Sequence, residues 1–485
     1  MDKQTKKNID FTILTLAVLL VVSAVLAVGG LMLSLRTLHI GAYAETLAAT
    51  SVGVFVLFAV LYVYLRYIVN SGEVDSLPFH KLLSIVYFTV AAGIILSCLA
   101  AGFLNSFAMP LACVALTVGI LIKIRTGLMS TIIAAFASLM IVCAANNAAE
   151  GVTILPEMIF GCIAAAVSGF AMIFLIRRRY SRFKLTWGAV IVALIMSPFS
   201  ALLSLIYSTD VSVVLQNALY SGVGNLISIA IMTASLPLYE RIANVWTDFS
   251  LEELISLRQP LLKRLSEEAP GTLSHCMAVA NLAESCAIAI GVNPFMARAC
   301  AYYHDVGKLK NPQFFVENQT DGYNPHDDLI PEVSASMITR HTKAGAEMLK
   351  EMHIPEEIVK AALEHHGDGA VGYFFMKAKY ITGERAKGVD EKEYRYDGPI
   401  PSTKYSALIM LCDIFEAMFR AKPPTDYEDM EEKVDKVVND KILEGQLNDC
   451  RLTMKDLHTI KDTICRIVPF TMHKRIDYAK AKERR

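Results

Sequence analysis

Paired cysteine motifs are missing from this chain, although it has ten cysteines among 485 residues. No CxxC spacing occurs, and every cysteine falls within a long apolar run or after residue 270. This distribution excludes a disulfide-stapled framework and indicates reduced, mostly buried thiols. A formal net charge of −1 also leaves no basic surplus, so a nucleic-acid polymer is not an expected partner.

Charged residues are scarce over roughly the first 240 residues, where eight apolar runs follow one another. The runs cover residues 11–35, 48–67, 82–103, 108–122, 128–145, 158–176, 187–206 and 213–236. Most are long enough to cross a bilayer as helices, but two are short, so eight is an approximate count. The runs hold essentially no ionisable residue in mid-span, which favours an anchor over a transport path.

Basic residues recur only in alternate loops between these runs. They are Lys3, Lys6 and Lys7, then Arg66 and Lys81, then Lys123 and Arg125, and finally the cluster from Arg177 to Lys184. The intervening loops hold Arg36 and several acidic residues. This bias predicts a multi-pass protein of the cell membrane with an even number of spans and both termini in the cytoplasm. The first run resembles an anchor rather than a cleaved signal peptide.

Alternating β-branched runs are scarce in the second half, so we expect an all-α fold throughout. Helices are predicted at residues 275–290, 294–304, 333–341, 343–352, 355–366, 403–420 and 454–467. Ser250 is a candidate helix N-cap, and Pro260 should interrupt or restart the connecting helix. The expected domains are a transmembrane region at 1–239, a helical linker at 240–269 and a cytoplasmic domain at 270–485.

Five short motifs in the cytoplasmic half carry candidate metal ligands. The ligands are His275, His304, Asp305, His341, His365, His366 and Asp413. Five imidazoles and two carboxylates suit a divalent metal such as iron, manganese or zinc. They are too many for one tetrahedral ion and fit two octahedral ions that share a carboxylate, the arrangement of two-metal phosphoester hydrolysis.

Roles other than metal binding are also open for Asp413 and His341. Asp413 lies in an apolar helical stretch, where it is costly unless it is paired, bound to a cation or bonded to a backbone cap. His341 alone is ambiguous and is included because it lies between the two histidine-rich motifs. Gly307 permits a sharp turn after His304-Asp305, and Lys308 brings a cation near the metals.

The motifs resemble those of HD-domain metal-dependent phosphohydrolases, whose name comes from the His-Asp pair. More specifically, the chain resembles the seven-transmembrane HD phosphodiesterases that hydrolyse cyclic di-AMP. The shared segments are APGT at 269–272, HDVGK at 304–308, FFVENQ at 314–319, NPH at 324–326, EHHG at 364–367, GPIPSTK at 398–404 and EGQL at 444–447. The resemblance extends from residue 260 to about residue 478.

This resemblance implies one metal on His275, His304, Asp305 and Asp413. It implies a second metal on His341, His365 and His366, with Asp305 bridging the two. Iron or manganese is the expected metal, Asp305 and Lys308 are the expected catalytic residues, and Lys308 would also hold a phosphate.

The chain departs from the family pattern in two places. Leu273 and Ser274 precede His275, where the family usually has tyrosine and histidine. Only about a dozen residues, near 36–47, follow the first run, where the family usually has a sizeable extracytoplasmic domain. HD-type cyclic di-GMP phosphodiesterases are not favoured, because Gly372-Tyr373 lacks the proline that completes their signature.

The residues that recognise the base must lie outside the metal ligands. Phe314 and Phe315 could stack on a base, although core packing is an equal alternative. Arg395 and Lys404 belong to a polar stretch at 380–404 that could close over the substrate and contact its distal phosphate. The alternative is a solvated insertion without a role.

The most favoured function is therefore hydrolysis of cyclic di-AMP to linear 5′-phosphoadenylyl-adenosine by a membrane-anchored enzyme. Two alternatives stay open: a nucleotide-binding membrane receptor without hydrolysis, and an HD phosphohydrolase for another nucleotide. Whether the chain forms a homodimer also stays open.

Overall fold

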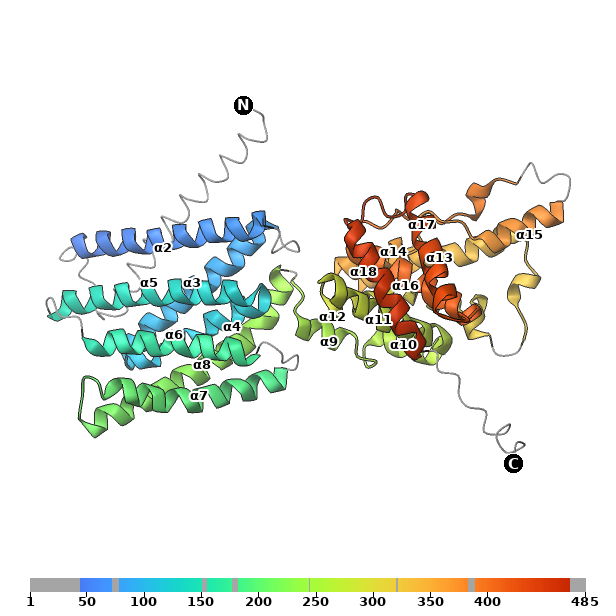
Figure 1. Cartoon of the computed structure of the whole chain (residues 1–485). Coiled ribbons are helices and arrows are strands. Elements are labelled where there is room, and N and C mark those ends of the chain that lie inside the picture. Colours follow the sequence, from blue (N-terminus) through green and yellow to red (C-terminus); the bar gives the residue numbers. More distant parts are fainter. Residues whose placement is uncertain are drawn as a thin grey trace, which may run out of the picture. The chain divides into compact units, whose positions relative to one another are not determined.

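The computed structural model describes residues 44–71, 78–150, 155–176, 182–243, 245–319, 322–382 and 389–471. The chain forms two compact units that divide between Phe249 and Ser250. Both are helical (Figure 1), and within the described ranges the only extended pairing is an isolated bridge between Ala370 and Arg395. The predicted all-α fold is confirmed.

Six long apolar helices form most of the first unit and lie side by side (Figure 1). They are α2 (Ala44–Asn70), α3 (Phe79–Phe103), α5 (Ile124–Glu150), α6 (Pro156–Ile176), α7 (Arg182–Ser204) and α8 (Val211–Ala243). Each is long and apolar enough to cross a bilayer. The protein is therefore a multi-pass membrane protein. The apolar run at 11–35 lies outside the described residues.

A shorter helix, α4 (Ala112–Leu121), follows the 3₁₀ turn η2 (Ser106–Ala108) and packs against α5, α6 and α8. Nearly all its side chains are buried, which explains why it is apolar on every face. Glycines on neighbouring helices make room for this segment: a Cβ on Gly224 would lie 2.5 Å from the Ala108 carbonyl oxygen. The short run at 108–122 is thus an interior element of the bundle.

A seventh helix, α11 (Pro270–Ile290), also meets the length and hydropathy of a membrane span. It belongs to the second unit, where it packs against α12, α16 and α18. Its buried face carries His275, and its apolar residues fill the core of that unit. We therefore assign α11 to the HD-containing unit and not to the membrane.

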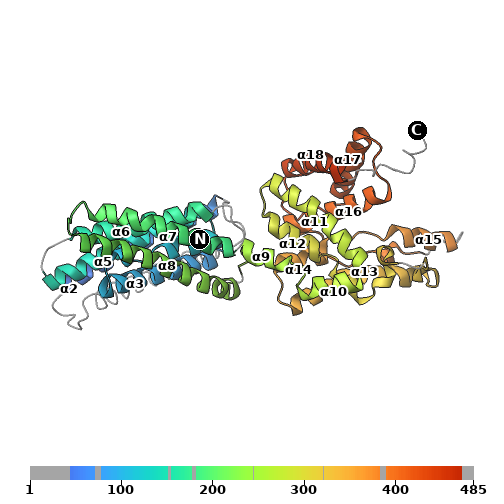
Figure 2. The same ribbon diagram turned by 90° about the horizontal axis from the view of Figure 1, so that it is seen from below.

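The second unit is a bundle of helices joined by short 3₁₀ turns (Figure 2). Its helices are α9 (Asp248–Leu254), α10 (Pro260–Glu268), α11, α12 (Pro294–Tyr303), α13 (Pro331–Glu351), α14 (Glu356–Glu364), α15 (Gly372–Thr382), α16 (Lys404–Ala421), α17 (Tyr427–Leu443) and α18 (Met454–Thr471). The 3₁₀ turns are η3 (Val306–Lys310), η4 (Pro312–Phe314), η5 (Val316–Asn318), η6 (Pro325–Asp327) and η8 (Glu391–Tyr394).

Several predicted boundaries change. The two helices expected at 333–341 and 343–352 are one helix, α13, while α15 and α17 were not predicted as separate helices. Pro260 starts α10, as a proline at the first helical position can. Ser250 lies inside α9, so its prediction as an N-cap was wrong.

Helix α16 is central to this unit, since it packs against α11, α12, α14 and α17. Leu408, Leu411 and Phe415 are fully buried along it. Thr403 caps its N-terminus in a reciprocal pair with Ser406. The cap and the packing hold α16 rigidly, so the carboxylate of Asp413 projects from a fixed scaffold.

Candidate metal centre and active site

All seven predicted ligands converge in the second unit. They come from five elements: His275 from α11, His304 and Asp305 from the end of α12, His341 from α13, His365 and His366 from the end of α14, and Asp413 from α16. Both adjacent pairs lie at the C-terminal end of a helix, where the first histidine keeps helical backbone angles and the helix ends. This placement lets neighbouring side chains point to one centre.

The first ligand group consists of His275, His304 and Asp413, whose candidate ligand atoms lie within 4.8 Å of one another. Nε2 of His275 is 2.9 Å from Oδ1 of Asp413. Nε2 of His304 is 4.0 Å from the same oxygen. His275 and His304 are buried, and Asp413 is 9% exposed.

The second ligand group consists of His341, His365 and His366, again within 4.8 Å of one another. Nε2 of His341 and Nε2 of His365 are 3.3 Å apart. Two imidazole nitrogens this close, each with its Nδ1 directed at a main-chain carbonyl, leave their Nε2 lone pairs pointing into the same space. That space suits a cation.

Asp305 lies between the two groups and divides its carboxylate between them. Its Oδ2 is 3.3 Å from Nε2 of His304 and 3.8 Å from Nε2 of His275. Its Oδ1 is 3.3 Å from Nε2 of His341 and 3.7 Å from Nε2 of His365. A carboxylate with one oxygen toward each group has the geometry of a bridging ligand.

Two unpartnered atoms indicate that this cluster fits a metal. Nε2 of His304 and Oδ1 of Asp305 are buried without a hydrogen-bond partner in the described part of the chain. Such groups are costly unless something else satisfies them. Cys276 also lies near His304, but its Sγ is 3.8 Å from Nδ1, the nitrogen that faces away from the cluster toward the Ala301 carbonyl.

The two groups differ in protonation. Burial disfavours the charged form of His275, but the carboxylates of Asp413 and Glu416 outweigh it and raise its pKa to about 10. Burial and the neighbouring imidazoles lower the pKa of His365 well below its usual range. Burial likewise lowers the pKa of His366 to about 3. Without metal, His275 therefore holds an extra proton at neutral pH, whereas His365 and His366 do not.

Lys308 is fixed by two carboxylates. Its Nζ lies 2.7 Å from Oδ2 of Asp305 and 2.9 Å from Oε1 of Glu317. The ammonium also lies 4.9 Å from the centre of the Phe315 ring. Burial disfavours its charge, yet the two carboxylates outweigh burial and raise the pKa of Lys308. Lys308 therefore orients the Asp305 carboxylate.

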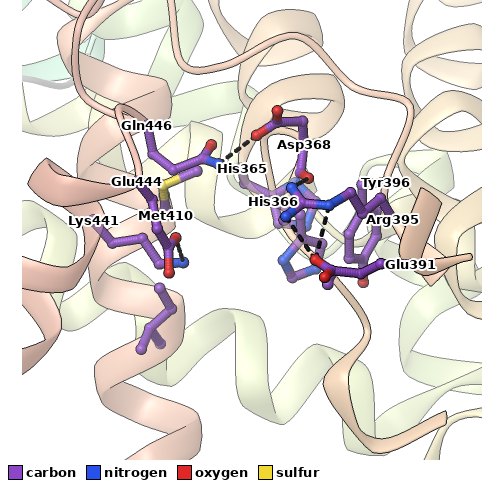
Figure 3. A pocket seen from close by; sticks show the side chains of 13 residues that line it. His365, His366, Asp368, Glu391, Arg395, Tyr396, Met410, Lys441, Glu444 and Gln446 are labelled. Carbon is purple, nitrogen blue, oxygen red and sulfur yellow. Dashed lines mark hydrogen bonds and ion pairs between the residues drawn. The ribbon is translucent and has the colours of Figure 1, made fainter. Parts of the chain in front are cut away.

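A cavity of about 420 Å³ adjoins His365 and His366. Figure 3 shows His366, Tyr396, Arg395 and Glu391 on one side and Lys441, Glu444, Met410 and Gln446 on the other. The Tyr396 ring stacks on His366, with ring centres 4.3 Å apart. Arg395 and Lys441 bring cations to opposite walls, each paired with a glutamate on its own wall. The cavity volume of about 420 Å³ is in the range of small-molecule binding sites.

The predicted substrate contacts occupy different places. Arg395 lines the 420 Å³ cavity. Phe315 is buried, meets His341 edge to face and lines a second cavity of about 280 Å³. Phe314 packs against His326. Lys404 does not line either cavity; its Nζ lies 3.0 Å from Oδ2 of Asp456 on α18.

Several residues that support the site were not predicted individually. Glu416 contacts Nδ1 of His275 at 2.5 Å. Glu364 is buried and accepts hydrogen bonds from the Ser402 backbone N–H and from the hydroxyls of Ser402 and Ser406. Its place before His365 could have suggested a role, and so could the serines of the GPIPSTK segment. No sequence pattern indicated Tyr396, because its contact with His366 joins residues that are far apart in the chain and forms only in the folded protein.

Comparison with known proteins gives two family matches. The family described as an HD domain matches residues 272–418. The family described as a 7TM receptor with intracellular HD hydrolase matches residues 45–247. The chain is therefore similar to this family of membrane proteins over residues 45–247, and to HD domains over residues 272–418. The order of its two matched parts agrees with the resemblance found in the sequence.

Curated relatives extend the match across both parts. The chain is 37% identical to cyclic-di-AMP phosphodiesterase PgpH of Listeria monocytogenes over 78% of its own length and 51% of that protein. It is 33% identical to PgpH of Bacillus subtilis over 78% of its own length and 52% of that protein. The chain thus spans about half the length of these relatives.

A solved structure also matches the second unit. It is the HD domain of L. monocytogenes PgpH in complex with cyclic-di-AMP, with 43% identity and a TM-score of 0.42. The match covers 45% of this chain and all of that domain.

Proposed function

We propose that this protein is a membrane-anchored, metal-dependent phosphodiesterase that hydrolyses cyclic di-AMP to linear 5′-phosphoadenylyl-adenosine. The observation that carries the proposal is the divided Asp305 carboxylate, with one oxygen toward each ligand group. A shared carboxylate between two sets of ligands is what a two-metal phosphoesterase requires. The names of the two bacterial relatives support the choice of substrate.

His275, His304 and Asp413 would hold one divalent ion, and His341, His365 and His366 would hold the other, with Asp305 on both. Imidazole and carboxylate ligands suit iron or manganese. When bound, such ions lower the pKa of a coordinated water toward ~7 and neutralise charge on a phosphoryl group. The remaining roles belong to the side chains: Lys308, which is itself held by Glu317, keeps the Asp305 carboxylate in place.

The 420 Å³ cavity would receive one nucleotide half of the substrate. Tyr396 stacks on His366 at its inner end, and Arg395 and Lys441 stand on opposite walls. Both cations are paired with glutamates, so an arriving phosphate would compete for them. The smaller cavity beside His341 and Phe315 is the candidate place for the other half. Lys404 is the weakest of the predicted contacts, because it is already paired with Asp456.

We further propose that both termini and the HD-containing unit face the cytoplasm, where a nucleotide second messenger is available. The alternation of basic loops supports this orientation. The proposed domains are the transmembrane region at 1–239, the linker at 240–269 and the catalytic domain at 270–485. The linker range includes α9 and α10.

The deciding experiment is product analysis of the purified full chain in detergent, loaded with manganese. Cyclic di-AMP, cyclic di-GMP, cyclic GMP-AMP and linear 5′-phosphoadenylyl-adenosine would be offered in parallel. We expect the first to be consumed fastest, with the linear dinucleotide as the initial product. Tight binding of cyclic di-AMP without any turnover would favour the receptor alternative. Faster hydrolysis of another compound would replace the proposed substrate.

A further inference from the structure

His275 differs from His304, His341 and His365 in the hydrogen-bond partner of its Nδ1 atom. Nδ1 of His304, His341 and His365 each faces a main-chain carbonyl of its own helix, at 2.8, 2.6 and 3.0 Å. Nδ1 of His275 instead faces Oε2 of Glu416 at 2.5 Å. Among these four histidines, His275 is the one anchored by a carboxylate.

Glu416 is itself held in position. It lies on α16 one helical turn after Asp413, so one rigid helix presents a carboxylate to each nitrogen of the His275 ring. Its second oxygen pairs with Arg420, four residues further along the same helix. The Glu416 side chain is only 10% exposed, so solvent screens the contact little.

The contact sets the chemical state of His275. A carboxylate at Nδ1 keeps the proton on that nitrogen, so the proton that leaves when a metal binds comes from Nε2, and Nε2 becomes the metal-binding nitrogen. A carboxylate partner also makes the imidazole a stronger electron donor than a carbonyl partner does. The first ligand group contains this residue and the Asp413 carboxylate, whereas the second group consists of three imidazoles.

We propose that Glu416 is a positioning residue for His275 and makes the His275–His304–Asp413 site the tighter of the two metal sites. This inference rests on the proposed two-metal function. The tighter site fills first and stays occupied, and the three-histidine site exchanges its ion with solution. Loss of such a partner typically weakens metal binding by about 10- to 100-fold.

The test is a Mn²⁺ titration of the metal-stripped full chain in detergent, followed by electron paramagnetic resonance and by metal analysis. The wild type should bind the first ion as an isolated, uncoupled centre and then form a coupled pair. Glu416→Ala should weaken the first step about 10- to 100-fold, so that the isolated centre no longer accumulates. Excess Mn²⁺ should restore the coupled pair in this variant.

Two further variants serve as controls, one for folding and one for the loss of an unrelated glutamate. Glu416→Gln keeps the shape and a hydrogen-bond acceptor, so it should fold and fall between wild type and Glu416→Ala. Glu268→Gln removes a glutamate from another ion pair between residues four apart, the exposed pair with Arg264 on α10, and this variant should bind both ions as the wild type does.

The outcomes separate the two ideas. If the wild type binds fewer than two ions, the two-metal function fails and the inference fails with it. If the wild type binds two ions but both Glu416 variants bind the first as tightly as wild type, the positioning role alone is wrong. Weakening of only the second step would likewise overturn it.

Discussion

At the scale of single residues, the geometry of the site depends on which imidazole each carboxylate oxygen faces. Asp305 gives one oxygen to each ligand group and also accepts an ion pair from Lys308. Asp413 turns one oxygen to His275 and the other toward His366. Each of the two aspartates therefore has one oxygen toward each group of imidazoles.

Replacing Asp305 should disable the centre. Asp305→Ala removes the shared oxygen atoms and leaves the buried Lys308 ammonium without its nearest partner, so we expect activity to fall below detection. Metal analysis should show a fall from two ions toward one or none. Asp462→Asn, which alters an exposed carboxylate paired with His458, is the control and should leave both unchanged. Near-normal turnover in Asp305→Ala would contradict a dinuclear centre.

Metal binding should depend on pH through the first ligand group. The raised pKa of His275, about 10, means that its proton is present at pH 7 and must leave before a metal can bind. Affinity should therefore rise as pH increases from 6 to 8, by about tenfold per unit for each displaced proton. His366, with its pKa lowered to about 3, adds nothing in this window. Calorimetry in buffers of different ionisation enthalpy counts the protons, and zero release would refute this account.

The seven candidate ligands, which the structure brings together, could be selected from the sequence because each lies in a short, recognisable motif. The sequence did not indicate a role for Glu416, although Glu416 lies only three residues after Asp413. Helical spacing places Glu416 beside Asp413 but does not reveal that α11 brings His275 between them. Lys404 shows the reverse problem: its motif suggested substrate contact, while its helix N-terminus packs near Asp456 of α18.

At the scale of elements, the close approach of η3 and α13 positions the second ligand group. Gly307 lies two residues after Asp305, and an added Cβ there would lie 1.9 Å from the His341 carbonyl oxygen and 2.5 Å from the Gly345 backbone nitrogen. The two backbones can approach this closely because Gly307 has no side chain, whereas a Cβ on Gly345 would lie 3.1 Å from the Gly307 nitrogen. This contact fixes the separation between Asp305 and His341.

Gly307→Ala should therefore force α13 away from η3. We expect a loss of about 1–3 kcal/mol in the free energy of unfolding, as for other overpacked sites. Activity should fall more than stability implies, because His341 moves with its helix. Gly372→Ala, at a position where an added Cβ meets nothing within 4 Å, is the matched control. Thermal unfolding and Mn²⁺ binding measured on both variants check the prediction; equal behaviour would contradict it.

The two helices expected at 333–341 and 343–352 are one helix, α13, which continues through the buried residue Thr342 without a break. Helix α17 was not predicted. Only Met430, Val434 and Val438 are buried along it, a narrow stripe in a strongly charged segment. The four-residue spacing of these three was a usable signal.

At the scale of the whole molecule, the short helix α4 decides the topology. If α4 and the run at 11–35 both cross the membrane, the spans number eight and both termini share one side. If α4 enters and returns on the same side, every later loop changes sides. The basic residues at Lys123 and Arg125, directly after α4, favour a complete crossing.

Reporter fusions can separate these arrangements. Green fluorescent protein fused after Arg125 or after Arg485 should fluoresce, because both positions are predicted to be cytoplasmic. Alkaline phosphatase inserted near Ala42 or fused after Tyr207 should be active, because both are predicted to lie outside. A phosphatase-active fusion after Arg125 would show that α4 does not cross. An external Arg485 would separate the proposed catalytic domain from a cytoplasmic nucleotide and would refute the proposed function together with the orientation.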